Sequence, residues 1–281
     1  MTDYQQVLFP YAYNILGSAE DAKDVIQDVI SKHYTSPKEG ILDEKNYLIK
    51  SVINLAINYK NRKKKMSPQP AEWLPEPIAT DDNADKNLYL KDILSYSLMI
   101  IMEKLSTMER AVFILRESFD YDHKDIAEVL SISEEYSRKL LSRAKSRLYK
   151  PGSITRSAEE QQKATDLLYS YIDAIRQGDV HRVENMLSAE ITMIADGGPH
   201  LNVVRKFCTG ATEVAPLLQL IFDKWQAKAE MVFRWINHQP AFLFFVEGKL
   251  SSCQVFELNE AGDAIIQVNN IVDPEKLKIL Q

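Results

Sequence analysis

Apolar residues recur at helical spacing through the first 150 positions of the chain. Residues 3–33 are predicted to be helical, with Ser18 as an N-cap that is followed by carboxylates in the next turn. Residues 43–65 are predicted to form a second long helix, whose apolar face consists of Leu48, Val52, Leu55 and Tyr59. The same spacing returns over residues 88–150, so the chain begins with two predicted all-helical groups.

Within the second group, residues 120–150 have the pattern of a helix-turn-helix. Ile126 and Leu130 are expected to bury the first helix, and Ser133 is expected to cap the second. The two carboxylates that follow this cap suit the helix dipole but would repel phosphates. The outer surface of the second helix is left with basic side chains, which are Arg138, Lys139, Arg143, Lys145 and Arg147. A recognition helix in the DNA major groove needs this arrangement.

The pattern changes after Pro151 and Gly152, which mark a boundary. Residues 158–177, 180–187 and 211–227 are predicted to be helical. The end of the chain consists of short apolar or alternating runs separated by turn residues, which predict a series of antiparallel strands. Helices followed by strands are typical of an α+β domain with a curved sheet wrapped over helices.

One face of the helix predicted over residues 43–65 is polar along its whole length. It carries a stripe at steps of three and four residues, which consists of Lys50, Asn54, Asn58, Asn61 and Lys65. Lys neutralises phosphates and Asn pairs with adenine in the major groove, while Tyr47 and Tyr59 offer rings for stacking on unpaired bases. A nucleic-acid surface is one interpretation of the stripe, and a solvated face is the other.

The net charge of −6 argues against a nucleic-acid partner, but its distribution does not. Residues 67–87 carry −4 and residues 151–281 carry −5, whereas the two helical groups carry +2 and +1. No apolar run approaches the roughly 20 residues that span a bilayer, and the N-terminus lacks the pattern of a signal peptide. We expect a cytoplasmic protein with no membrane partner and with reduced thiols at Cys208 and Cys253.

The acidic stretch between the helical groups contains the sequence WLPEP at residues 73–77. A linker rich in proline and carboxylates is expected to be solvated, yet this one holds Trp73 and Leu74. Flanking prolines limit the entropy that such side chains lose when they dock. We therefore interpret Trp73 and Leu74 as anchors for a surface elsewhere in the chain.

These stretches resemble a known family. AYNILGSAEDAKDVIQDVI and KNYLIKSVINLAINYKNRKKK resemble region 2 of bacterial extracytoplasmic-function (ECF) sigma factors, and LSTMERAVFILRESFDYDHKDIAEVLSISEEYSRKLLSRAKSRL resembles their region 4. One subgroup of this family also has a WLPEP motif between the regions and a C-terminal SnoaL-like domain with DGG-type and NPDKL-type motifs. This chain is similar to it through WLPEP, DGGPH and VDPEKL, although Pro199, His200 and Val272 depart from the pattern.

The resemblance implies a multidomain fold, in which two all-α sigma domains precede an α+β SnoaL-like cone-shaped domain. The expected parts are a region 2 domain, a linker with the WLPEP motif, a region 4 helix-turn-helix domain, a short linker and a C-terminal regulatory domain. Their predicted boundaries are 1–66, 67–87, 88–150, 151–157 and 158–281.

By this resemblance the chain is a sigma factor, which is not an enzyme, needs no cofactor, binds core RNA polymerase and directs it to promoter DNA. Contacts with core polymerase are expected from Asp24, Val25, Gln27 and Asp28. The promoter −10 element is expected to contact Lys50, Asn54, Asn58, Tyr59, Asn61, Arg62 and Lys63. The −35 element is expected to contact Ser137, Arg138, Lys139, Ser142 and Arg143.

The C-terminal domain is expected to act as a built-in regulator in place of a separate anti-sigma protein. In this hypothesis the WLPEP segment docks on that domain, near the DGG-type motif or the final motif. The interdomain regulatory residues would be Trp73, Leu74, Pro75, Glu76, Pro77, Asp196, Gly197, Gly198, Asp273, Pro274, Lys276 and Leu277. The alternative is that Trp73 packs on its own sigma region.

Three other functions stay open at this point. SnoaL-like domains include cyclases and isomerases that use a carboxylate as acid or base, for which the candidates are Asp173, Asp196, His200 and His238. A sensor of a small ligand is the second, with a pocket lined by Met193, Phe207, Trp225, Phe233, Trp235 and Phe244. The third is a helix-turn-helix regulator that binds DNA without polymerase. No metal site is predicted.

Overall fold

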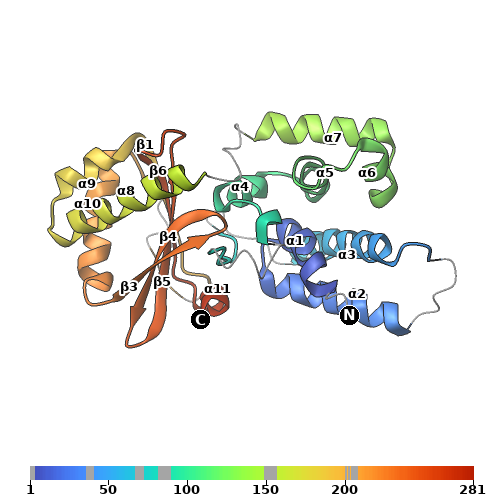
Figure 1. The fold of residues 1–281 in the computed structure, drawn as a ribbon, viewed down its shortest axis with the longest axis horizontal. Helices are drawn as coiled ribbons and strands as arrows, with labels where there is room; N and C mark the ends of the chain where they lie inside the picture. The colour runs from blue at the N-terminus through green and yellow to red at the C-terminus, as the bar shows by residue number, and fades with distance from the viewer. Residues whose placement is uncertain are drawn as a thin grey trace. The chain divides into compact units, whose positions relative to one another are not determined.

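The computed structural model describes residues 4–35, 41–66, 73–81, 90–148, 157–199, 201, 203 and 208–281. The chain divides into two compact units (Figure 1). Unit 1 consists of Met1–Gln69 and Asp82–Pro151, and unit 2 consists of Pro70–Asp81 and Gly152–Gln281. The WLPEP segment therefore belongs to the same unit as the C-terminal part of the chain. Within the described ranges, no helix is both long enough and apolar enough to cross a membrane.

Unit 1 begins with three helices, which are α1 Tyr4–Leu16, α2 Ala19–Thr35 and α3 Glu44–Met66. The helical stretch predicted over residues 3–33 is two helices, because Gly17 adopts a φ of 77° and ends α1. Ser18 Oγ accepts a hydrogen bond of 3.1 Å from the Asp21 N–H and caps α2, as its sequence position predicts. The three helices contact one another through buried apolar side chains.

The second part of unit 1 consists of η1 Leu90–Asp92, α4 Tyr96–Ile101, η2 Met102–Lys104, α5 Thr107–Glu117, α6 His123–Leu130 and α7 Glu134–Arg147. Polar side chains define the helix starts. Ser106 and Glu109 form a capping box at α5, Asp122 caps α6, and Ser133 caps α7. Ser131 takes a left-handed φ of 54° after α6 and reverses the chain. Helices α6 and α7 form the predicted helix-turn-helix.

Unit 2 is an α+β domain. Its helical elements are α8 Ala158–Arg176, α9 Val180–Met186, α10 Ala211–Ile221, the π-helical turn η3 Phe222–Gln226, α11 Pro274–Leu277 and η4 Lys278–Leu280. Its strands are β1 Leu187–Asp196, β2 Cys208–Thr209, β3 Glu230–Ile236, β4 Gln239–Val246, β5 Lys249–Leu258 and β6 Ile265–Ile271. They form one sheet in the order β2-β1-β6-β5-β4-β3.

The sheet is mixed, because the antiparallel strands expected from the sequence are joined by a parallel strand, β1, that the sequence did not predict. The predicted strands β3 to β6 pair antiparallel with their neighbours. Strand β1 pairs with β6 in parallel. It begins at Leu187, directly after α9, so the helix predicted over 180–187 ends one residue earlier and is followed by a strand. Burial along β1 does not alternate strictly, so no period-two pattern marks this strand in the sequence.

The two faces of the sheet are covered by different parts of unit 2. Helices α8, α9 and α10 lie on one face (Figure 1), where Phe242, Phe244 and Phe256 belong to the buried core. Leu243 lies between Phe242 and Phe244 on β4, so it points to the opposite face, and it is also buried. Segment 73–81 forms hydrogen bonds at both ends: Leu74 bonds to Asp196 at the end of β1, and Ile78 bonds to Asn237 just after β3. Because β1 and β3 lie far apart in the sheet, the segment crosses the sheet, on the face away from α8, α9 and α10.

Candidate nucleic-acid interface and tether clasp

The residues predicted to contact polymerase lie on α2, and three of the four are at its surface. Asp24, Gln27 and Asp28 are exposed. Val25 is only 2% exposed and packs in the core beneath them. The prediction for Val25 is corrected, because a buried side chain supports the helix from inside and cannot reach a partner.

The C-terminal half of the α3 stripe is open to solvent. Asn58, Asn61, Arg62 and Lys63 are exposed, and Tyr59 is half-buried. The guanidinium of Arg62 lies 5.5 Å from the centre of the Tyr59 ring, and Lys63 Nζ lies 5.9 Å from it. Cationic groups beside amide side chains and one aromatic ring are the residue types that contact phosphates and bases.

Tyr59 and Lys63 are held by Asp21 of α2. The Tyr59 hydroxyl donates a hydrogen bond of 2.9 Å to Asp21 Oδ1, and Lys63 Nζ lies 2.6 Å from Asp21 Oδ2. Burial, followed by this hydrogen bond, raises the pKa of Tyr59 to about 12, so the hydroxyl remains a neutral donor. The pairing fixes the ring against α2 and engages Lys63, one of the three cations predicted to contact the −10 element.

The N-terminal half of the stripe is partly covered by α6. Asn54 Nδ2 donates hydrogen bonds of 2.9 Å to the carbonyl oxygens of Lys50 and Val129. Lys50 Nζ lies 3.8 Å from Glu128 Oε1. The predicted −10 stripe is therefore divided into an open half and a half that contacts the helix-turn-helix.

Ser137 is the second prediction that the structure corrects. Its side chain is fully buried, and its Oγ lies 2.9 Å from His123 Nδ1 at the start of α6. Ser137 therefore joins the two helices of the helix-turn-helix and is not available to DNA. Position 137 directly precedes the basic residues of α7 in sequence, but its side chain turns to the inner face of the helix.

Arg138 and Lys139 are exposed on α7, and both form ion pairs one turn back along the helix. Arg138 Nη2 lies 2.8 Å from Glu134 Oε2, and Lys139 Nζ lies 2.7 Å from Glu135 Oε1. Exposed pairs at this spacing contribute only about 0.3–0.5 kcal/mol, so phosphates can compete with the carboxylates. The other two predicted contacts, Ser142 and Arg143, are exposed as well.

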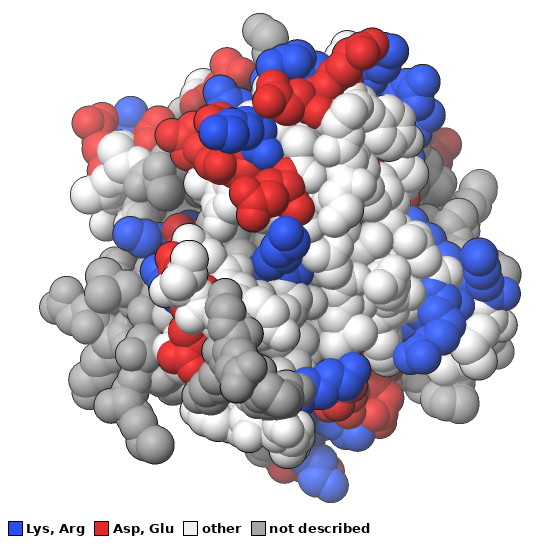
Figure 2. All heavy atoms as spheres, turned by 90° about the vertical axis from the view of Figure 1, so that its right-hand side faces the viewer, with Lys and Arg blue, Asp and Glu red and all other residues white. Residues whose placement is uncertain are grey.

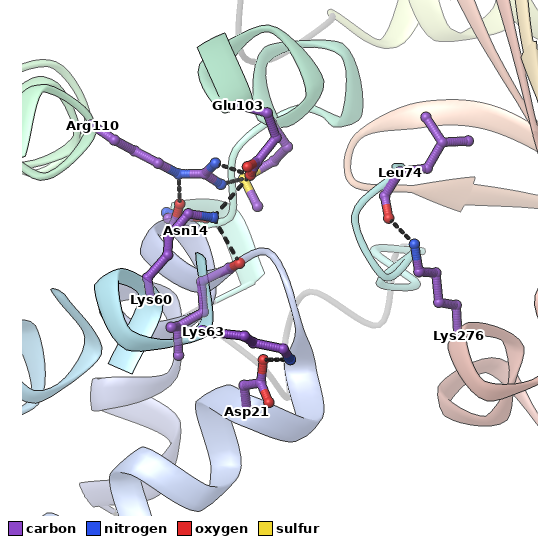
Figure 3. A network of polar contacts seen from close by, with 10 residues as sticks. Asn14, Asp21, Lys60, Lys63, Leu74, Glu103, Arg110 and Lys276 are labelled. Atoms are coloured by element: carbon purple, nitrogen blue, oxygen red, sulfur yellow. Dashed lines mark hydrogen bonds and ion pairs between the residues drawn. The ribbon is translucent and has the colours of Figure 1, made fainter. Parts of the chain in front are cut away.

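A buried polar network joins the first three helices of unit 1 to the second part of the unit (Figure 3). Arg110 of α5 is fully buried; its Nε donates to the Asn14 carbonyl oxygen at 2.8 Å, and its Nη1 pairs with Glu103. Lys60 of α3 donates bonds of 3.0 Å to the same carboxylate and to the Leu16 carbonyl oxygen. The Asn14 side chain adds bonds to the backbone of residues 92 and 94.

This network holds two cations and one carboxylate. Burial, followed by the charge of Arg110, lowers the pKa of Lys60 to about 7, although Glu103 opposes the shift. Burial alone would raise the pKa of Glu103, but the charges of Arg110 and Lys60 outweigh it and lower that pKa. Sequence reasoning missed all three residues, because Lys60 precedes a basic run and Arg110 lies in an ordinary amphipathic helix.

In unit 2, Leu74 is held by two charged residues of the C-terminal part. Its N–H donates a hydrogen bond of 2.8 Å to Asp196 Oδ2, and its carbonyl oxygen accepts one of 2.5 Å from Lys276 Nζ (Figure 3). Lys276 Nζ also lies 2.5 Å from Asp196 Oδ2 and 4.5 Å from the centre of the Trp73 ring. We call this arrangement of Trp73, Leu74, Asp196 and Lys276 the tether clasp.

The tether clasp is a buried site. Leu74 is fully buried, and Asp196 and Lys276 are 8% and 7% exposed. Burial lowers the pKa of Lys276, whereas Asp196 acts to raise it. Pro75 and Pro77 are buried as well, and Glu76 is half-buried. Each backbone polar group of Leu74 is paired with a charged side chain, which offsets the cost of removing both from water.

A second anchor holds the other end of segment 73–81. Ile78 N–H donates to Asn237 Oδ1, and Asn237 N–H donates to the Ile78 carbonyl oxygen, both at 2.8 Å. Thr80 N–H donates to the Trp235 carbonyl oxygen at 2.7 Å, and Asp81 Oδ1 accepts from the Trp235 N–H at 2.7 Å. The segment therefore adds a short stretch of pairing to the edge strand β3.

Glycines shape the turn behind the tether clasp. Gly198 has a φ of +64°, and a Cβ atom there would lie 2.4 Å from Asp273 Oδ2. A Cβ atom on Gly197 would lie 2.8 Å from the Leu201 carbonyl oxygen. Asp273 caps α11, which begins with Pro274 and carries Lys276 and the buried Leu277. The DGG-type and final motifs are thus packed against each other, and together they place Asp196 beside Lys276.

Family models match both helical parts of unit 1. Residues 1–66 match the family described as Sigma-70 region 2, and residues 97–148 match Sigma-70, region 4. The Mycobacterium tuberculosis protein named "Probable ECF RNA polymerase sigma factor SigI" is 26% identical and covers 99% of this chain and 93% of its own length. The chain is an ECF sigma factor.

A further relative, SigJ of M. tuberculosis, is similar to this chain in both sequence and structure. The M. tuberculosis "ECF RNA polymerase sigma factor SigJ" is 26% identical over 68% of this chain, and the match spans 62% of SigJ. The crystal structure of M. tuberculosis SigJ has a TM-score of 0.76 at 20% identity, and covers 98% of this chain and 95% of that chain. The fold of this sigma factor is therefore shared along almost its whole length. The predicted fold class, two helical sigma regions followed by an α+β domain, is confirmed.

The family gives names to the two parts of unit 1. Region 2 of this sigma factor contains α1 to α3, and region 4 contains α4 to α7. On the face that Figure 2 shows, Lys and Arg form several separate groups that alternate with acidic groups around a broad uncharged area. The basic character of this sigma factor is thus local, which fits its net charge of −6.

Sigma factors are not enzymes, and the candidate acids and bases of the C-terminal domain have other positions. Asp196 is used in the tether clasp, Asp173 is exposed, and the backbone N–H of His238 donates to Thr80 Oγ1. His200 and Phe207 lie outside the described residues. In the part of the chain that is described, no three His, Cys, Asp or Glu side chains are grouped as metal ligands.

The residues predicted to line a ligand pocket also lie in different surroundings. Met193 and Phe244 belong to the packed core of unit 2, and Phe233 and Trp235 lie at its margin. Trp225 is 60% exposed on the π-helical turn, beside Lys224. Four of these five residues therefore belong to or border the packed core, and Trp225 lies at the surface.

Proposed function

We propose that this sigma factor binds core RNA polymerase through α2 and recognises promoters through regions 2 and 4, while its C-terminal domain modulates initiation in cis by holding the tether. Polymerase works in the bacterial cytoplasm, so we expect the protein to act there. The exposed residues of α2, the open half of the α3 stripe and the outer face of α7 supply the three contact surfaces. No separate anti-sigma protein is required for this control.

The tether clasp is the observation that supports cis modulation. Segment 73–81 lies between the end of α3 at Met66 and the start of η1 at Leu90. A free chain extends by at most about 3.3–3.6 Å for each residue. A segment that is hydrogen-bonded at both ends has a fixed length, so it contributes no variable extension to the tether. The effective concentration of region 4 at the −35 element depends on that reach once region 2 has bound the −10 element. The C-terminal domain therefore acts on promoter spacing through the tether.

Run-off transcription with purified core polymerase tests this proposal. Wild-type protein is expected to direct initiation from a cognate promoter. Lys276→Met removes the ammonium from the tether clasp and is expected to change the yield by at least about threefold through the effective concentration. The matched control is Lys278→Met, because Lys278 pairs with Glu275 at the surface. Equal yields from the two variants would contradict cis modulation, and no initiation by the wild type would contradict the proposed function as a whole.

A further inference from the structure

One row of residues crosses the helix-covered face of the unit 2 sheet and is polar at its centre. The strand register pairs Phe233 of β3 with Phe242 of β4, and Phe242 with Gln254 of β5. Gln254 is paired in turn with Asn270 of β6, and Asn270 with Ala195 of β1. Side chains that are paired in register point to the same face, and Phe242 belongs to the core that α8 to α10 cover. We call these five residues the amide row.

The two amides at the centre of the amide row are buried and incompletely paired. Gln254 is 1% exposed and Asn270 is 5% exposed. Among the described residues, Gln254 Nε2 and Asn270 Oδ1 have no hydrogen-bond partner. An unpaired polar group in a protein interior is destabilising, and almost all such groups are paired in folded proteins. An unpaired donor opposite an unpaired acceptor therefore points to a bound molecule that pairs with both.

The side chains around the two amides limit the chemistry of such a molecule. None of the five residues of the amide row is ionisable, so a charged group placed there would lose its hydration without gaining a counter-charge. The next polar contact on this face is also uncharged. Ser252 precedes Gln254 by two residues on β5, and its Oγ accepts a bond of 3.5 Å from Gln226 Nε2 of η3. A neutral molecule therefore fits this face best.

The β3 end of the amide row is aromatic. The rings of Phe233 and Phe242 have centroids 5.7 Å apart, and the Tyr169 ring of α8 lies 5.9 Å from that of Phe233. Tyr169 is 52% exposed, so the aromatic group extends from the buried amides to solvent. Aromatic side chains beside a few convergent polar groups are typical of sites for small molecules.

We propose that the amide row is a binding site for a small neutral carboxamide with an apolar body. The carbonyl oxygen of the ligand accepts from Gln254 Nε2, its N–H donates to Asn270 Oδ1, and its apolar body lies against the phenylalanines. The site is back to back with the tether clasp, because Ala195 ends the amide row and the next residue of β1, Asp196, binds Leu74. The inference does not rest on the proposed function, since binding is measured without polymerase or promoter.

Benzamide is the probe for this site, and benzoate is its matched charged control. Saturation-transfer NMR on the full-length protein is expected to give a Kd of about 1 mM for benzamide, which lies within the range for a ligand of its size. Benzoate has the same ring but is negatively charged at pH 7, so we expect it to bind at least about tenfold more weakly. No binding of benzamide, or equal binding of benzoate, would overturn the inference.

A pair of glutamine variants separates a binding role from a structural one. Gln254→Met replaces the unpaired amide with an apolar side chain of similar shape. We expect it to weaken benzamide binding at least about tenfold, and to raise the midpoint of thermal unfolding of unit 2 by about 2–4 °C because an unpaired donor is removed. A Gln254→Met protein that binds benzamide as tightly as the wild type, or that unfolds at a lower temperature, would overturn the inference.

Gln267→Met is the matched control on the opposite face of the sheet. Gln267 adjoins Val268, which belongs to the helix-covered core, and its Nε2 donates to Asn269 Oδ1 at 2.9 Å. Because this amide is already paired, Gln267→Met is expected to lower the unfolding midpoint and to leave benzamide binding unchanged. Loss of benzamide binding in Gln267→Met equal to that in Gln254→Met would place the probe elsewhere and contradict the assignment.

Discussion

Two buried polar clusters hold parts of this sigma factor together, and they differ in charge balance. In unit 1, Lys60 and Arg110 share the single carboxylate of Glu103. In unit 2, Lys276 and Asp196 form a balanced pair that also binds both backbone groups of Leu74. The first cluster joins two folded regions of the chain, whereas the second fastens an extended segment to a domain.

The difference indicates how each contact can be released. The unit 1 network holds two cations and one carboxylate. Its stability therefore depends on Glu103 and on whether Lys60 carries its proton. The tether clasp is neutral as a whole and depends on the turn that places Asp196 beside Lys276. A change in charge is therefore expected to act mainly on unit 1, and a change in backbone shape mainly on the tether clasp.

The largest effect is expected from Glu103→Ala. This change leaves Arg110 and Lys60 buried without a counter-charge, so we expect unit 1 to lose about 3–5 kcal/mol of unfolding free energy. Glu117→Ala is the control, because Glu117 pairs with the half-exposed Lys145 and should cost no more than about 1 kcal/mol. Urea denaturation measures both. Equal losses would show that the network does not hold the regions together.

A pair of glycine variants examines the turn behind the tether clasp. Gly178 and Gly198 have φ values of +69° and +64°, but only Gly198 lacks room for a Cβ atom. Gly178→Ala should cost about 1–2 kcal/mol from the left-handed backbone alone. Gly198→Ala should cost about 1–3 kcal/mol more, because the methyl group displaces Asp273 and with it α11. Thermal unfolding of unit 2 that is identical for both variants would contradict this role of Gly198.

The most gradual predicted effect is a pH dependence of unit 1. The pKa of Lys60 is lowered to about 7 in the folded protein, while an unfolded lysine titrates near about 10.4. Between these values the unfolded chain binds more protons, so stability rises with pH, by up to about 1.4 kcal/mol per pH unit. Lys60→Met is expected to remove this rise between pH 7 and 9. Parallel stability curves for the two proteins would show that Lys60 titrates normally.

The sequence predicted the elements whose signal is local. Ser18 and Ser133 marked helix starts, because a capping side chain acts within its own turn. Trp73 and Leu74 stood out as anchors, because apolar side chains in an acidic, proline-rich stretch have no local use. Their partners Asp196 and Lys276 lie in two motifs that the family resemblance singled out, although the contacts themselves are distant in sequence.

Residues whose roles depend on distant partners could not be predicted. Val25 and Ser137 lie among surface residues in sequence, but each points to the inner side of its helix. Asn54 has the same residue type and spacing as the exposed Asn58, and only the position of α6 distinguishes them. Strand β1 pairs with β6 across most of unit 2, so no hairpin signal links the two.

Amide hydrogen exchange of Leu74 measures whether the C-terminal domain holds the tether through this residue. In full-length protein the Leu74 N–H donates to the buried Asp196 carboxylate. We expect this N–H to be protected at least about 100-fold relative to an unstructured chain, and to lose most of that protection in Lys276→Met but not in Lys278→Met. Exchange of Leu74 at the unstructured rate in the wild type would contradict the account.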